Sequence, residues 1–169
     1  MNFKRQKVKL GHFSGLPAFS KALVERMNSG VPELQDFVPV ELCALDYCPK
    51  RGSAIDPHLD DEWLWGERLV TLNFLSPTLL TFSLPSCATE ILIPLPQRSL
   101  VIVGGPARHS WLHAIKRQHI VSRRVGVTLR ELSSEFLAEG REEEVGRTIL
   151  EIAGSFQGQP TNCRPVILQ

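Results

Sequence analysis

The sequence predicts an α+β domain in which many short β-strands form a sandwich or jelly roll and helices pack outside it. Three observations lead to this class. An early segment has apolar residues at helical spacing, the middle of the chain is a series of short apolar segments broken by Gly and Pro, and helical spacing returns only after Arg130. The length of 169 residues suits one domain, residues 1–169, with a proper hydrophobic core.

The first predicted element is a helix that begins at about Pro17, with Phe19, Leu23 and Met27 on one face. Two prolines then prevent a long helix, and the segment VELCALDYC, residues 40–48, predicts a strand. A turn follows in PKRGSAIDPHLDD, residues 49–61, and leads into a short strand or loop.

Six further segments are typical of strands because they are short, rich in apolar and β-branched residues, and separated by turn residues. They are RLVTLNFLS (68–76), LLTFSL (79–84), EILIPL (90–95), RSLVIVGG (98–105), HSWLHAI (109–115) and RRVGVTLREL (123–132). The last predicted element is a helix within residues 141–157, where apolar side chains recur every three or four residues, at Val145, Ile149, Ile152 and Phe156.

Composition narrows the possible functions. The chain carries 19 basic and 18 acidic side chains, a formal net charge of +1, which disfavours a dedicated nucleic-acid binder. Its four cysteines include no CxxC pair, so we expect them to be reduced, as in the cytosol or nucleus. No apolar run is long enough to span a membrane, and the basic run FKRQKVK, residues 3–9, is predicted to be solvated.

A metal site is indicated by His58 and Asp60, because residues two apart on a strand share one face. A further His would complete the two-His-one-carboxylate triad of non-haem Fe(II) oxygenases. The downstream candidates are His109, His113 and His119. Strand parity does not separate His109 from His113, but the apolar residues after His113 favour it, since His109 follows a Gly-Gly-Pro turn.

The segment RVGVTLR, residues 124–130, alternates a polar and an apolar face. Arg124 and Arg130 fall on the polar face, together with Thr128. Such a triad commonly uses 2-oxoglutarate, a dicarboxylate whose remote carboxylate needs a buried cation, and the planar fork of Arg suits that task. An exposed edge strand with solvated arginines is the alternative for this segment taken alone.

The order PHLDD, RHSWLHAI, RRVGVTLREL resembles the AlkB-type Fe(II)/2-oxoglutarate dioxygenases, which have an HxD motif, a distal His and an R-x-N-x-T-x-R strand. The resemblance extends from about Asn2 to Pro160. It implies a double-stranded β-helix (jelly-roll) core with flanking helices. It also implies Fe(II), 2-oxoglutarate and O₂ as cofactors and co-substrates, with His58, Asp60 and His113 as the iron ligands.

The same resemblance implies roles around the co-substrate. Arg124 matches the residue that holds the remote carboxylate of 2-oxoglutarate, Arg130 the one at its metal side, and Tyr47 a tyrosine that hydrogen-bonds it. Two positions depart from the family pattern: Gly126 stands where the arginine strand has Asn, and Leu45 where many members have Asn.

Within the family, the chain is most similar to a member described as a demethylase of monomethyl-lysine on actin. This implies removal of N-methyl groups, actin and actomyosin components as partners, a role in cytokinesis, and a place in cytoplasm and nucleus. The alternatives are a DNA N6-methyladenine demethylase and a non-catalytic actomyosin-binding scaffold. The neutral charge and the absence before Met1 of the region that forms a substrate lid in nucleic-acid-repairing members disfavour the DNA enzyme.

Two expectations concern substrate recognition. Asp61, Trp63 and Trp65 can contribute an acid and two indoles to a cage for a methylated ammonium, although the tryptophans are more simply core or rim residues. The segment from Leu79 to Ile93 is shorter than the resemblance implies, so we expect a truncated or alternatively spliced form in which the core site is present.

Overall fold

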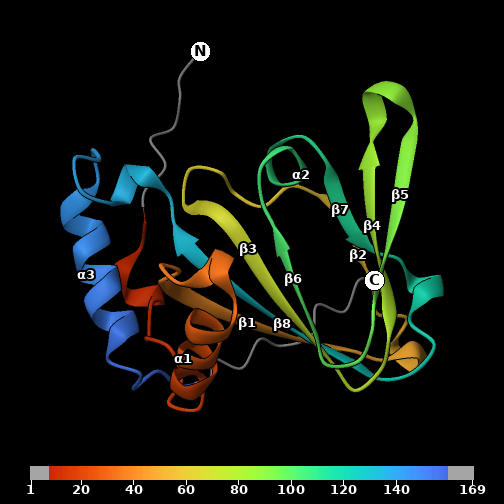
Figure 1. The fold of residues 1–169 in the computed structure, drawn as a ribbon, viewed down its shortest axis with the longest axis horizontal. Coiled ribbons are helices and arrows are strands. Elements are labelled where there is room, and N and C mark those ends of the chain that lie inside the picture. The colour runs from red at the N-terminus through yellow and green to blue at the C-terminus, as the bar shows by residue number, and fades with distance from the viewer. Residues whose placement is uncertain (1–7, 160–169) are drawn as a thin grey trace.

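The computed structural model describes residues 8–159, which form two antiparallel sheets of four strands each (Figure 1). Most of the basic run predicted to be solvated, residues 3–7, lies outside the described residues. The first sheet has the order β1-β8-β3-β6: β1 Pro39–Tyr47, β8 Arg124–Leu132, β3 Trp65–Phe74, β6 Ser99–Val103. The second has the order β2-β7-β4-β5: β2 Ile55–His58, β7 Leu112–Ile115, β4 Thr78–Leu84, β5 Thr89–Leu95.

Three α-helices accompany the sheets: α1 Ser20–Gly30, α2 Pro106–His109 and α3 Glu143–Gly154. Single 3-10 turns lie between elements, at Leu10–His12, Pro32–Leu34, Pro49–Arg51, Pro85–Cys87, Arg117–His119 and Ser134–Phe136. Two facing antiparallel sheets with α1 and α3 packed outside confirm the predicted α+β jelly roll (Figure 1). No helix in the described range is long and apolar enough to cross a membrane.

The period-two pattern of the central strands divides the interior into two layers. Leu69 on β3 packs between the sheets with residues of β4, β5, β6 and β7. Its neighbour Val70 points to the opposite face, where it packs with Val127 and Leu129 of β8 under Met27 of α1. Each fully buried aliphatic side chain contributes about 1.5–3 kcal/mol to folding. The burial of Val127 and Leu129 under α1 therefore stabilises one orientation of β8, in which its other face is turned toward the space between the sheets.

A third apolar cluster attaches α3. Its residues Ile149 and Ala153 pack with Leu16, Leu132 and Phe136. This agrees with the periodic pattern read from the sequence, in which Ile149 is the central position.

The structure corrects three local expectations. The first helix begins at Ser20 instead of Pro17, and Phe19 is 65% exposed, because residues 17–19 form a turn whose Pro17 carbonyl accepts a hydrogen bond from Ser20. Strand β2 ends at His58, so Asp60 lies in the following loop. Strand β7 begins only at Leu112, so His109 does not share its face.

Candidate functional site

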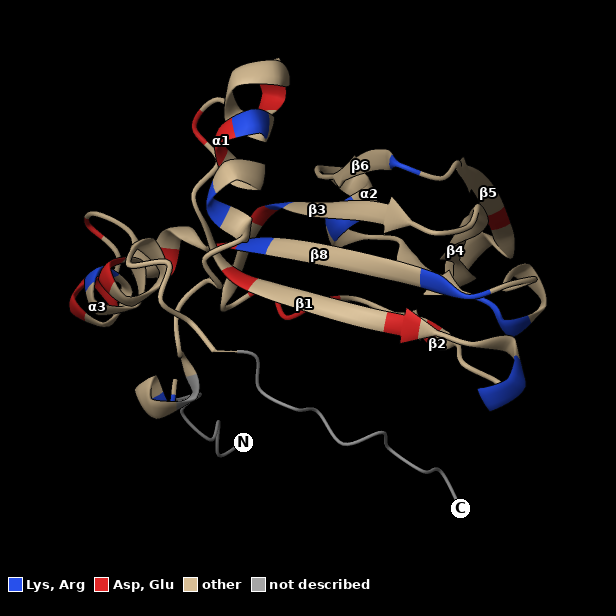
Figure 2. Cartoon of the chain, turned by 90° about the horizontal axis from the view of Figure 1, so that it is seen from below, with Lys and Arg blue, Asp and Glu red and all other residues tan. Residues whose placement is uncertain are grey.

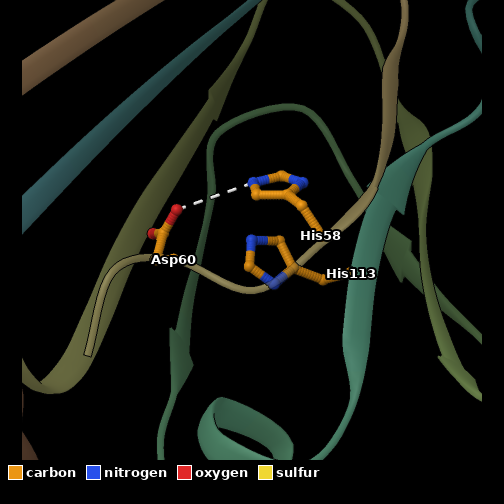
Figure 3. A group of neighbouring side chains, drawn as sticks. All are labelled: His58, Asp60 and His113. Carbon is orange, nitrogen blue, oxygen red and sulfur yellow. Dashed lines mark ion pairs between the residues drawn. The ribbon is translucent and has the colours of Figure 1, made fainter. Parts of the chain in front are cut away.

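Three side chains with metal-binding chemistry point toward one another beside β2 and β7 (Figure 3). One ligand atom from each of His58, Asp60 and His113 lies within 4.8 Å of the others. The antiparallel pairing of β2 with β7 places His58 directly opposite His113, with ring centroids 4.4 Å apart. Asp60, two residues further on, brings its Oδ1 to 3.5 Å from His58 Nε2.

A backbone carbonyl sets the orientation of the His58 ring. Its Nδ1 lies 2.8 Å from the carbonyl oxygen of Asp56. A carbonyl can only accept, so Nδ1 must carry a proton, and in the neutral ring the lone pair is then on Nε2, which faces Asp60. Metal-ligating histidines typically have this second hydrogen bond.

Asp60 is held as a carboxylate. Burial alone would raise the pKa of Asp60, but its interactions with His58 and Arg130 outweigh burial and hold that pKa well below its usual range. Arg130 Nε donates to Asp60 Oδ2 at 2.9 Å, and its Nη1 donates to Glu41 Oε2 at 2.5 Å. Since its guanidinium is paired with two acids, the role of Arg130 at the metal side of 2-oxoglutarate stays a prediction.

His113 is kept neutral by its surroundings. Burial lowers the pKa of His113 from 6.5 to about 4, and the charge of His58 acts in the same direction. Its Nδ1 is buried and has no hydrogen-bond partner among residues 8–159. A neutral imidazole with an available lone pair is the form that binds a metal. Two imidazoles and one carboxylate therefore fit a first-row metal such as Fe(II).

We expect the metal-free protein to lose stability as the pH falls. The unfolded chain protonates His113 below its ordinary pKa of 6.5, whereas the folded protein does so only near a pKa of 4, so unfolding is favoured between these values. Thermal unfolding at about pH 7 and about pH 5 measures the loss. The His113→Phe variant should lose less thermal stability between these two pH values than the wild type. An equal loss of stability in the variant and the wild type would contradict this expectation.

The polar face predicted for β8 lines a cavity next to the three side chains. Arg124, Gly126, Thr128 and Arg130 all border it. Lys or Arg side chains occur at both ends of β8, and neither occurs in its middle (Figure 2). The rest of the cavity wall is largely apolar, with contributions from β3, β4, β5, β6 and β7: Leu69, Leu80, Leu95, Val103 and Ile115.

Arg124 is a buried cation at the edge of this cavity, only 2% exposed. Its Nε donates to Asn73 Oδ1, and its guanidinium lies 4.7 Å over the ring of Tyr47. No acidic side chain in the described part of the chain forms an ion pair with it, although removing a charge from water is costly unless it is paired. An anionic ligand group would supply the missing partner.

Tyr47 also borders the cavity, and the register of β1 and β8 places it opposite Arg124. Burial raises the pKa of Tyr47, so its hydroxyl is protonated at neutral pH. A protonated hydroxyl beside Arg124 can donate a hydrogen bond to a carboxylate, as its predicted role requires.

Asp61, Trp63 and Trp65 are not brought together as a cage. Asp61 Oδ1 accepts hydrogen bonds from the backbone of residues 63 and 64, which stabilises a turn. Trp63 packs edge-on against Phe136 at 4.9 Å, and Trp65 packs against the core between the sheets. Both tryptophans are half-buried, and none of the three residues is on the cavity lining, so their role in substrate recognition stays a prediction.

The other two histidine candidates lie outside the cluster. His109, the last residue of α2, contacts Glu62 and Glu67 through its two ring nitrogens at 2.8 and 2.9 Å. His119 lies in a 3-10 turn, where its carbonyl accepts a hydrogen bond from Thr78.

No sequence pattern pointed to Arg108, a fully buried residue of α2. Its guanidinium donates to the backbone carbonyls of Asp60 and Asp61 at 3.0 Å, and to those of Trp65 and Gly66 at 3.3 Å. Arg108 therefore holds the loop that carries Asp60 through backbone carbonyls, and these four hydrogen bonds do not involve the three side chains of the cluster.

Replacing Arg108 by Met should destabilise the protein by about 2–4 kcal/mol and weaken metal binding, because four carbonyls lose a charged donor. Denaturant unfolding and titration with Mn(II) measure the two effects. The exposed Arg26 of α1 provides the control, Arg26→Met. An Arg108→Met protein as stable as this control would show that the loop does not need the clamp.

No protein-family model matches the chain, but individual proteins do. Alpha-ketoglutarate-dependent dioxygenase alkB homolog 4 of Homo sapiens is 52% identical over 190 residues, covering 95% of this chain and 63% of the human protein. The Mus musculus protein of the same name is 48% identical with the same coverage. A DNA N6-methyl adenine demethylase of Caenorhabditis elegans is 34% identical over 155 residues, covering 90% of this chain and 53% of that protein.

The chain thus spans about two thirds or less of the length of the curated relatives it matches. Among solved structures, a Pseudomonas putida prolyl-4-hydroxylase is similar at a TM-score of 0.45 and 14% identity, over 67% of this chain and 63% of that one.

Proposed function

Since this chain is homologous to the AlkB-type α-ketoglutarate-dependent dioxygenases, we propose that it is an Fe(II)- and 2-oxoglutarate-dependent dioxygenase that oxidatively removes N-methyl groups. The observation that carries the proposal is a single cavity with two complementary features. The cluster of His58, Asp60 and His113 borders it, and so does Arg124, a buried cation with no acidic partner in the described residues. A dicarboxylate such as 2-oxoglutarate can bind a metal in the cluster at one end and the Arg124 guanidinium at the other.

The side chains divide the work. His58, Asp60 and His113 would hold the iron, and Arg130 keeps the Asp60 carboxylate oriented through its two hydrogen bonds. Arg124 would bind the remote carboxylate of 2-oxoglutarate, and the apolar wall excludes water between the two ends. Bound iron, with 2-oxoglutarate as electron source and O₂ as oxidant, supplies the chemistry that hydroxylates the methyl group, which then leaves as formaldehyde.

For the substrate we propose monomethyl-lysine on actin, in cytoplasm and nucleus, with a role in actomyosin organisation and cytokinesis. The support is the likeness to the alkB homolog 4 proteins and a net charge of only +1, which does not favour a nucleic acid. The second candidate is N6-methyladenine in DNA, because the Caenorhabditis elegans relative is named for that activity. A non-catalytic actomyosin scaffold would not need the unpaired cation in the cavity.

The full chain, loaded anaerobically with Fe(II) and 2-oxoglutarate and then exposed to O₂, tests this. Succinate and formaldehyde are measured with a monomethyl-lysine actin peptide and with N6-methyladenine DNA. We expect both products with the peptide. Products with the DNA alone would overturn the actin assignment, and no product with either substrate, in a protein that binds both iron and 2-oxoglutarate, would overturn the demethylase assignment for this chain.

A further inference from the structure

The guanidinium of Arg124 is positioned by two neighbouring residues, Asn73, which is not on the cavity lining, and Gly126, which is. On the neighbouring strand β3, Asn73 is 1% exposed and lies directly opposite Gly126 of β8. The other residue opposite Gly126, Leu45 of β1, is apolar. Asn73 is therefore the only side-chain amide among the cross-strand partners at this level of the sheet.

The orientation of the Asn73 amide is dictated by its surroundings. Its Nδ2 donates to the carbonyl oxygens of Ser76 and Leu95 at 3.0 Å and of Pro96 at 2.9 Å. A flipped amide would set its oxygen against three carbonyl oxygens, so Oδ1 must point the other way. There it accepts the hydrogen bond from Arg124 Nε. With Nε engaged, recognition of a carboxylate falls to the two Nη groups, beside the Tyr47 hydroxyl.

Gly126 supplies the space in which this guanidinium lies. A Cβ atom at this position would come within 3.0 Å of both Nη1 and Nη2 of Arg124. Glycine is not required there by the backbone, because Gly126 is not among the residues with positive φ. A Cβ at this position would therefore require the guanidinium to shift by a few tenths of an ångström.

We propose that Asn73 and Gly126 are positioning residues that set the place of the Arg124 guanidinium, and that they thereby make the cavity selective for 2-oxo dicarboxylates over 2-oxo monocarboxylates. This inference rests on the proposed function, since it concerns the co-substrate of the same site. The selectivity comes from rigidity. A cation that is fixed at one distance from the metal cluster adds binding energy only for a ligand whose second carboxylate lies at that distance.

The test uses the full chain loaded with Mn(II), which is redox-inactive under anaerobic conditions, and calorimetric titration with 2-oxoglutarate or with 2-oxobutyrate, which lacks the remote carboxylate. Gly126→Ala should weaken 2-oxoglutarate binding about tenfold and leave 2-oxobutyrate binding unchanged within about twofold. Asn73→Ala should show the same ligand-selective loss. The control is Gly154→Ala, since a Cβ at Gly154 meets nothing within 4 Å.

The outcomes separate this inference from the function beneath it. If a variant binds both ligands more weakly by the same factor, the positioning roles are overturned while 2-oxoglutarate dependence stands. The same holds if folded Gly126→Ala binds 2-oxoglutarate as tightly as wild type. A wild-type protein that binds Mn(II) but neither 2-oxo acid overturns both. Thermal unfolding of each variant identifies any loss of binding that comes from misfolding, and the two substitutions lie on different strands, β3 and β8, so each tests the proposal independently.

Discussion

Asp60→Ala and His58→Ala should each weaken metal binding by at least about a hundredfold and bring turnover below detection. The expectation follows from the geometry, since three ligand atoms within 4.8 Å of one another leave no spare ligand among the described residues. Substitution of a residue that only hydrogen-bonds a metal ligand typically lowers metal affinity about 10–100-fold, so removal of a ligand itself should lower it further. Anaerobic Fe(II) or Mn(II) titration, followed by succinate measurement, gives both quantities.

The two variants disturb different neighbours, which makes them a useful pair. Asp60→Ala also leaves Arg130 with only Glu41 as a partner, whereas His58→Ala leaves the Arg130 pair with Asp60 in place. A common loss of metal binding therefore reports the shared cluster and not the ion pair. His109→Ala is the matched control, because that exposed histidine contacts two glutamates and lies outside the cluster. Metal affinity within about twofold of wild type in both variants would remove the cluster from the mechanism.

Local periodicity explains how much of this site could be predicted from the sequence. The alternation in RVGVTLR depends only on neighbours along one strand, and the structure places Arg124, Gly126, Thr128 and Arg130 together on the cavity. The meeting of His58 with His113 depends on the pairing of β2 with β7, which spans 55 residues of chain and is not encoded in any local spacing. From the residues alone, His113 was favoured only by its apolar neighbours, and the resemblance to a known family then implied that it shares a site with His58.

Burial was the property that local sequence predicted least well. Arg108 lies shortly after Gly104-Gly105-Pro106, where no local pattern indicates burial, yet it is fully buried and its guanidinium donates to four backbone carbonyls of residues 60–66. Conversely, Ile91 and Leu92 are apolar residues of the predicted strand EILIPL, but they are 44% and 46% exposed because β5 is an edge strand. Asn73 did leave a signal, as the single amide within the apolar segment RLVTLNFLS, since a buried polar group requires partners.

Arg124→Met should separate binding from stability. The substitution keeps an unbranched apolar stem and removes the charge, so we expect 2-oxoglutarate binding to weaken on the order of a hundredfold or more, as for truncation of a buried hydrogen-bonded charge pair. Metal binding should be unaffected. The free energy of unfolding should change by no more than about 1 kcal/mol, because loss of the hydrogen bond to Asn73 is offset by removal of a buried cation that has no acidic partner in the described residues.

This combination distinguishes a ligand-binding arginine from a structural one. If Arg124 served mainly to hold Asn73 and Tyr47 in place, Arg124→Met would lower stability by several kcal/mol and would weaken 2-oxoglutarate and 2-oxobutyrate alike. If it binds the remote carboxylate, the loss is confined to the dicarboxylate and the fold is preserved. Denaturant unfolding and the two titrations, done on the same protein, decide between these cases. The structural case predicts a loss of stability, and the ligand-binding case predicts a loss of 2-oxoglutarate binding without a loss of stability.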